Sequence, residues 1–169
     1  FDSAQRSVVG LADYVEGGAN GGYTPRGTGV VWSDFGYVVT NFHVVMTYVP
    51  GAPGGGGGGG GGGKNGGGGV GGSKQLRVNV PDVKTGDAVW YDAVVVGTQR
   101  STDVAVLKIT PVGMGGGGGG ADNSNLPSTL RAMPIGESDG LRVGQSCYAL
   151  GAGDTSDADG NRGVSSFRQ

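Results

Sequence analysis

Two runs of glycine set the limit on what this chain can fold into. Of its 41 glycines, 16 lie between Gly54 and Gly72, and six more form Gly115–Gly120. Such runs bury too little apolar area to offset the backbone entropy that ordering costs, so we interpret both as flexible loops. The rest of the 169 residues can close one hydrophobic core, but hardly two.

The sequence outside the glycine runs has the alternation of β-strands. Its valine-rich segments predict six strands, over Ser7–Tyr14, Gly29–Trp32, Tyr37–Thr40, Gln75–Val80, Ala88–Gly97 and Asp103–Ile109. Ser33–Gly36 is a turn signal between the second and third strands, and only His43–Tyr48 has room for a short helical turn. Short strands separated by Gly, Pro and Asp turns predict an all-β fold, a closed antiparallel barrel over residues 1–112.

The residues after the barrel are poorer in strand signals. Residues 113–140 include the second glycine run, and we expect them to form a flexible connector. Residues 141–169 contain two more strand candidates, Gly144–Leu150 and Gly163–Phe167. An isolated strand pair is marginal in water, so we interpret residues 141–169 as the first strands of a second barrel that this sequence does not finish.

Charge and composition argue against several kinds of partner. The 12 Lys and Arg and 14 Asp and Glu are scattered, which argues against nucleic acid or an anionic membrane surface. No apolar stretch approaches the roughly 20 residues that span a bilayer. Cys147 is the only cysteine, so it has no partner for an internal disulfide, and we interpret it as a small buried hydrophobe.

An acidic cluster near the end of the sequence invites a calcium interpretation. Asp154, Asp157 and Asp159 precede Gly160, but an EF-hand loop would need an acidic ligand at Thr155 and a glutamate at Ser166. The cluster is better explained as a solvated loop. We therefore expect neither a metal nor a cofactor.

The candidate catalytic residues are His43, the only histidine, and Asp103. An imidazole suits general-base catalysis at neutral pH, and a carboxylate on its second ring nitrogen fixes the tautomer. We expect His43 to follow a strand and Asp103 to open one, which can place both at the same rim of the barrel. A lone histidine is more often structural, and a lone aspartate at a strand start is more often a turn former.

A serine nucleophile in a Gly-x-Ser-Gly-Gly setting is absent from the 169 residues. Ser146, Ser165 and Ser166 lie in strand-like runs without the tight glycine turn that exposes a nucleophile and supplies oxyanion N–H groups. None of the three serines is expected to act as the nucleophile.

Four motifs in this order resemble the Deg/HtrA family of serine proteases. They are Gly27-Thr28-Gly29-Val30-Val31-Trp32, Gly36-Tyr37-Val38-Val39-Thr40-Asn41-Phe42-His43-Val44-Val45, Asp103-Val104-Ala105-Val106-Leu107-Lys108-Ile109 and Leu141-Arg142-Val143-Gly144-Gln145. The resemblance covers most of the chain outside the glycine runs. Within the family the sequence is most similar to the plastid members, mainly through Leu141–Cys147.

The resemblance implies a chymotrypsin-like double barrel, with the first barrel complete here and the second only begun. It implies that His43 is the general base and Asp103 its partner. It also implies ATP-independent endoproteolysis of damaged or unfolded proteins, in homo- or hetero-oligomers of Deg-type subunits, and a location in the chloroplast, in the thylakoid lumen.

Two features depart from the family pattern. Where relatives tend to have Gly-Asn-Pro-Phe-Gly, this chain has the acidic, turn-like segment Gly151–Arg162. The sequence also begins at Phe1 rather than Met, and the family serine would follow Gln169. We therefore expect a processed or incomplete chain that is inactive alone.

Two alternatives remain. One is a pseudoprotease that serves as a structural subunit of a Deg hetero-oligomer. The other is a non-enzymatic β-barrel binding module, in which His43 and Asp103 would not be hydrogen-bonded to each other. A functional pair would bring an imidazole nitrogen within about 3.2 Å of a carboxylate oxygen.

Overall fold

A computed structural model of the 169-residue chain describes most of the predicted barrel. The described residues are 6–16, 22–49, 74–81, 88–110, 126, 130–146, 149–152, 155–156 and 162–163. The predictions for the two glycine runs, Cys147, the acidic cluster and the serines at 165 and 166 lie outside these residues. None of the helices in the described residues is long and apolar enough to cross a membrane.

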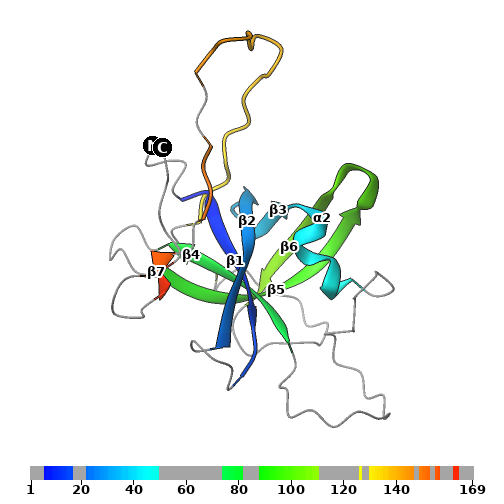
Figure 1. Ribbon diagram of the computed structural model, residues 1–169, viewed down its shortest axis with the longest axis vertical. Helices are drawn as coiled ribbons and strands as arrows, with labels where there is room; N and C mark the ends of the chain where they lie inside the picture. The colour runs from blue at the N-terminus through cyan, green and yellow to red at the C-terminus, as the bar shows by residue number, and fades with distance from the viewer. Residues whose placement is uncertain are drawn as a thin grey trace.

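Six antiparallel strands close into a barrel in the order β1-β2-β3-β6-β5-β4 (Figure 1). The strands are β1 (Val8–Tyr14), β2 (Tyr23–Ser33), β3 (Tyr37–Thr40), β4 (Gln75–Pro81), β5 (Ala88–Gln99) and β6 (Val104–Thr110). Three short helical segments are α2 (Phe42–Val45), η2 (Met46–Tyr48) and η3 (Arg100–Thr102). The predicted all-β barrel is confirmed.

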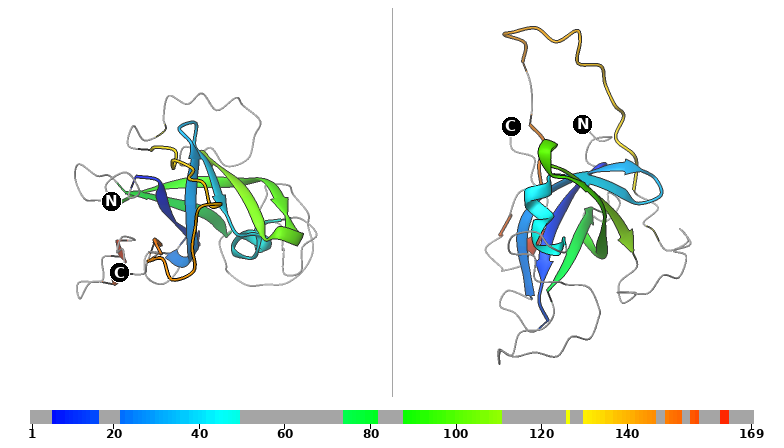
Figure 2. Two further views of the ribbon diagram at one scale, coloured as in Figure 1. Left: turned by 90° about the horizontal axis from the view of Figure 1, so that it is seen from above. Right: turned by 90° about the vertical axis from the view of Figure 1, so that its right-hand side faces the viewer.

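Alternate residues of β6 fill the inside of the barrel, whereas β1 is buried at every residue from Val8 to Asp13. On β6 the inward residues are Ala105, Leu107 and Ile109, all at most 1% exposed, and the residues between them face outward. The strands wrap around this core, as the two views in Figure 2 show. The fully buried side chains include Leu11, Leu107, Ile109, Leu130, Val9, Val31, Val38, Val45 and Val78.

Strand β2 starts earlier than its sequence predicts, at Tyr23 instead of Gly29. Pro25 lies in this early part, opposite Ala12 of β1, at a shift in the β1–β2 register between Leu11 and Ala12. Strand β3 pairs only with Val30–Ser33, so Pro25 faces no second strand there. Proline lacks a donor, and strands accept it at bulges and at unpaired edges.

The turn from β2 to β3 follows the prediction and has a further contact from the connector. Gly36 adopts φ +82° and donates its N–H to Ser33 O at 3.0 Å, a conformation that glycine adopts without strain. A Cβ on Gly36 would lie 3.1 Å from the side chain of Leu126. The turn is therefore tight, and the side chain of Leu126 packs against it.

Part of the predicted connector packs into the barrel. Leu130 is 1% exposed and belongs to the hydrophobic core. Two hydrogen bonds hold the next residues to β2 and its turn, from Met133 N to Val31 O at 2.9 Å and from Ala132 N to Asp34 Oδ1 at 2.8 Å. The segment after them extends away from the barrel in Figure 1.

The strand predicted over Gly144–Leu150 is absent from the part of that segment that the structure describes. Residues 141–146 form turns, with hydrogen bonds from Leu141 N to Ser138 O and from Gln145 N to Arg142 O, both at 3.1 Å. Further on, β7 (Thr155–Ser156) and β8 (Arg162–Gly163) pair antiparallel in a separate two-stranded sheet. The described residues of the predicted strand, Gly144–Ser146, Ala149 and Leu150, include no β-branched or aromatic side chain, the types that strands favour.

Candidate active site

His43 lies in the first turn of α2, directly after β3 ends at Thr40. Phe42, Val44 and Val45 on this helix are buried, whereas the His43 side chain is 67% exposed. The apolar residues fix the helix to the barrel, and the imidazole projects from the rim.

The two glycines of the Gly-Thr-Gly motif allow this close packing. A Cβ on Gly27 would lie 3.1 Å from Val44 Cγ2, and a Cβ on Gly29 would lie 2.5 Å from Val38 Cγ1. Real Cβ atoms essentially never come as close as the second distance. Strand β2 can therefore support β3 and α2 only because these positions lack side chains.

Asp103 lies between η3 and β6 in a left-handed backbone conformation, with φ 54° and ψ 43°. It is the only non-glycine residue with positive φ among the described residues, and aspartate tolerates this region better than most residue types. Its carbonyl oxygen accepts hydrogen bonds from Phe42 N and Asn41 Nδ2, both at 3.1 Å. The backbone just before His43 is thus tied to the backbone of Asp103.

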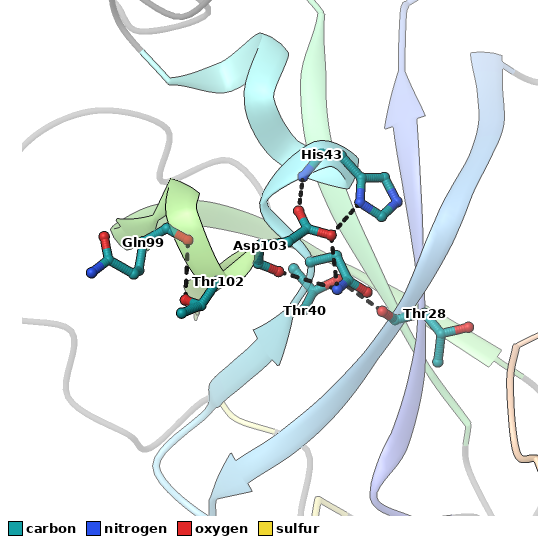
Figure 3. A network of polar contacts seen from close by, with 7 residues as sticks. Thr28, Thr40, His43, Gln99, Thr102 and Asp103 are labelled. Carbon is teal, nitrogen blue, oxygen red and sulfur yellow. Dashed lines mark hydrogen bonds and ion pairs between the residues drawn. The ribbon is translucent and has the colours of Figure 1, made fainter.

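The carboxylate of Asp103 contacts His43 at two points (Figure 3). Oδ2 lies 2.7 Å from the ring nitrogen Nδ1, and Oδ1 accepts the His43 backbone N–H at 2.9 Å. Asn41 Nδ2 also donates to Oδ2 at 3.2 Å. The predicted contact between an imidazole nitrogen and a carboxylate oxygen is therefore present, in the geometry that a base and its orienting carboxylate need.

These hydrogen bonds favour the ionised form of Asp103. The backbone N–H of His43, followed by its ring, lowers the pKa of the Asp103 carboxyl below its ordinary value, and Asn41 adds to the effect. The aspartate side chain is 43% exposed, so solvent screens the pair and its contribution to stability is small. The arrangement is better suited to orienting the imidazole than to holding the fold together.

The ring orientation determines what His43 can do chemically. With Nδ1 donating to Asp103, the neutral ring leaves Nε2 as a hydrogen-bond acceptor on the side away from the carboxylate (Figure 3). An exposed acceptor of this kind can take a proton from a nearby hydroxyl. No group of three or more His, Cys, Asp or Glu that could hold a metal occurs among the residues with described positions.

Three polar residues around the pair received no role from the sequence. Besides Asn41, Thr40 donates through Oγ1 to Thr28 O at 2.8 Å, and Thr28 Oγ1 accepts from Ala152 N at 3.0 Å. These contacts join β3, β2 and the segment 149–152 beside His43. All three residues lie within the family motifs, which was the only sequence signal for them.

Comparisons with known proteins bear on the family of this chain and on its fold. Residues 27–168 match the family described as "Trypsin-like peptidase domain". Protease Do-like 8 and Protease Do-like 5, both chloroplastic proteins of Arabidopsis thaliana, are each 29% identical to this chain, over 148 and 132 residues. The alignments cover 87% and 78% of this chain, but only 24% and 31% of the two relatives.

A solved structure matches the fold as well. The crystal structure of Deg5 superposes with a TM-score of 0.53 and 25% sequence identity, over 89% of this chain and 52% of that one. The present chain thus spans about a quarter to a third of the length of the two curated relatives and about half of the solved structure.

Proposed function

This chain belongs to the trypsin-like peptidase domain family and is distantly homologous to chloroplast Deg proteases, and we propose that it provides the general base and orienting carboxylate of a serine endopeptidase. The observation that supports this most is the two-point contact of Asp103 with His43. A structural ion pair needs only one contact, whereas fixing both the backbone and the ring determines where Nε2 points.

In the proposed reaction His43 acts through Nε2. It takes the proton of a serine hydroxyl as the oxygen attacks the carbonyl of the scissile peptide bond, and it then gives that proton to the leaving amine. Water hydrolyses the acyl-enzyme in a second round of the same proton transfers. Asp103 stays ionised and stabilises the imidazolium that forms in each round.

The serine and the oxyanion donors are proposed to come from parts of the enzyme other than His43 and Asp103. The exposed fractions of His43 and Asp103, 67% and 43%, fit a pair that a further part of the enzyme covers. A triad carboxylate works best when buried, because water otherwise weakens its interaction with the ring. We propose that the second barrel of the family covers the His43–Asp103 pair.

Substrates, assembly and location follow from the relatives and are proposals for this chain. We propose that it acts on unfolded or damaged proteins without ATP, in an oligomer of Deg-type subunits. The two relatives above are named as chloroplastic. A chloroplast location is proposed on that basis, and the thylakoid lumen is proposed from the family resemblance alone.

The test is a peptidase assay on the natural polypeptide that contains this chain, including any coding sequence that continues past Gln169. We expect cleavage of β-casein that falls by about three orders of magnitude or more in His43→Ala. Asp139→Asn, a change at an exposed aspartate in the connector, is the matched control and should leave the rate unchanged. Equal activity of the wild type and His43→Ala would refute the proposal.

A pseudoprotease subunit is the second candidate. The acidic segment Gly151–Arg162 favours it, because this segment replaces an apolar one where the family's second barrel begins. The two candidates differ in the same assay. A pseudoprotease would be folded, would have no peptidase activity in its natural full length, and would bind an active Deg-type subunit.

A further inference from the structure

A second carboxylate, Asp13 of β1, lies inside the barrel and holds the far end of the segment that carries His43. Asp13 is 4% exposed. Its Oδ1 accepts the hydroxyl of Tyr48 at 2.5 Å, and its Oδ2 lies 2.5 Å from Arg26 Nε and 2.6 Å from Lys74 Nζ. Three segments, from β2, η2 and the start of β4, therefore meet at one buried group.

Tyr48 joins this cluster to the helical segment. It is the last residue of η2, its ring packs against the hydrophobic core, and its hydroxyl also contacts Gln75 O at 3.2 Å. Burial, followed by the hydrogen bond to Asp13 and the charge of Asp13, raises the pKa of the Tyr48 hydroxyl. Tyr48 thus remains a proton donor to Asp13 under all ordinary conditions.

The segment from Phe42 to Tyr48 is therefore held by a carboxylate at each end. α2 leads directly into η2, with no residue between Val45 and Met46. Asp103 binds the backbone and ring of His43 in the first turn, and Asp13 binds the side chain of Tyr48 in the last. The two carboxylates come from different strands of the same barrel, β1 and the start of β6.

The hydroxyl of Tyr48 has no role in balancing charge. Arg26 and Lys74 already supply two positive charges to the single negative charge of Asp13. Burial of Val44 and Val45 packs α2 against the barrel, and the hydrogen bond from Tyr48 to Asp13 adds a directional contact at the end of η2. A hydrogen bond to a charged acceptor has a preferred direction and is among the stronger kinds.

We propose that Asp13 and Tyr48 are positioning residues for His43: their hydrogen bond fixes the orientation of the segment Phe42–Tyr48, and thereby the contact between His43 Nδ1 and Asp103. The inference rests on the proposed function, because it gives His43 the role of the base. The effect of the Asp13–Tyr48 hydrogen bond on the His43 ring does not depend on activity and can be measured in this chain.

The experiment uses nuclear magnetic resonance of the chain labelled with ¹⁵N-histidine. His43 is the only histidine, so its two ring nitrogens give the only imidazole signals. In the neutral ring, the nitrogen shifts report which nitrogen holds the proton. The rate at which the Nδ1 proton exchanges with water reports how well Asp103 holds it.

Tyr48→Phe removes the hydroxyl and keeps the partly buried ring that packs on the core. We expect the Nδ1 proton of His43 to exchange roughly threefold to tenfold faster, and the share of Nε2–H tautomer to rise. Tyr23→Phe is the matched control, because the Tyr23 hydroxyl also binds a charged group, Arg77 Nη1 at 2.7 Å, but lies on β2 and outside the helical segment. It should leave both readings unchanged.

Asp13→Asn provides a second test, because its amide oxygen still accepts from Tyr48 but carries no charge. We expect an effect of the same sign and smaller than that of Tyr48→Phe. A folded Tyr48→Phe with wild-type exchange and tautomer would overturn the proposal. Failure of both variants to fold would also overturn it, since the cluster would then hold the barrel rather than orient the histidine. Loss of the proposed peptidase function would show in the casein assay and leave these readings unaffected.

Discussion

Asp103 holds His43 with both of its carboxylate oxygens, one on the backbone N–H at 2.9 Å and one on ring Nδ1 at 2.7 Å. The residues are 60 positions apart in sequence and meet at the barrel rim. The left-handed conformation of Asp103 turns its side chain toward α2, and its carbonyl binds the backbone of Phe42. The contact therefore joins the end of β3 to the start of β6.

The pH dependence of stability should reveal this contact. The native pKa of Asp103 is lowered, so between that value and its ordinary value near 4 the unfolded chain binds more protons than the folded one. The stability that Asp103 contributes is therefore present above about pH 4 and is lost as the pH falls through the lower, native pKa. Asp103→Asn tolerates the same backbone conformation and cannot ionise.

We expect the difference in free energy of unfolding between wild type and Asp103→Asn to be small, because the pair is exposed, and to shrink as the pH falls from about 5 to 2. Urea unfolding followed by tryptophan fluorescence at several pH values measures it. A difference that stays constant over this range would mean that Asp103 has no lowered pKa in the native state.

The Gly-Thr-Gly motif should be intolerant of a methyl group at Gly29. Because the added Cβ would lie 2.5 Å from Val38 Cγ1, Gly29→Ala should destabilise the barrel by about 1–3 kcal/mol, as overpacking does. Gly97→Ala on β5 is the control, since nothing lies within 4 Å of its added Cβ, and it should change stability by less than about 0.5 kcal/mol. Equal effects in urea unfolding would contradict the packing described for β2.

Leu130 should behave as a core residue although it lies in the predicted connector. Its side chain is 1% exposed, so Leu130→Ala should cost about 2–5 kcal/mol, as buried leucines do. Leu141→Ala is the matched control, because Leu141 is 66% exposed, and its effect should stay within about 0.5 kcal/mol. If the two variants have the same stability, Leu130 does not belong to the barrel.

Most of the barrel could be predicted from the alternation of valines. Strand β3 has the predicted bounds, and β1, β4, β5 and β6 differ from the prediction by at most two residues at an end. The early half of β2 was missed because Pro25 and Gly27 are typical of loops, and only the register shift at Leu11 and the close packing of Gly27 on Val44 make them suitable there. Such features depend on the partner strand and leave no local signal.

Contacts between distant segments were harder to predict. The apolar residues around Leu130, which include Leu126, Met133 and Ile135, do not alternate as in a strand, so no strand periodicity marks Leu130 as buried. The pair His43 and Asp103 was predicted because each lies in a recognisable motif. Asp13 and Tyr48, 35 positions apart, lie in no such motif, and only the closing of the barrel brings them together.

The tautomer of His43 decides whether Asp103 orients a base, because such a base must hold its proton on Nδ1 and leave Nε2 free. We would measure it by ¹⁵N nuclear magnetic resonance of the neutral ring in the wild type and in Asp103→Asn. We expect Nδ1–H in the wild type and a switch to Nε2–H in the variant, whose amide can donate to Nδ1. A wild-type ring with its proton on Nε2, unchanged by Asp103→Asn, would contradict it.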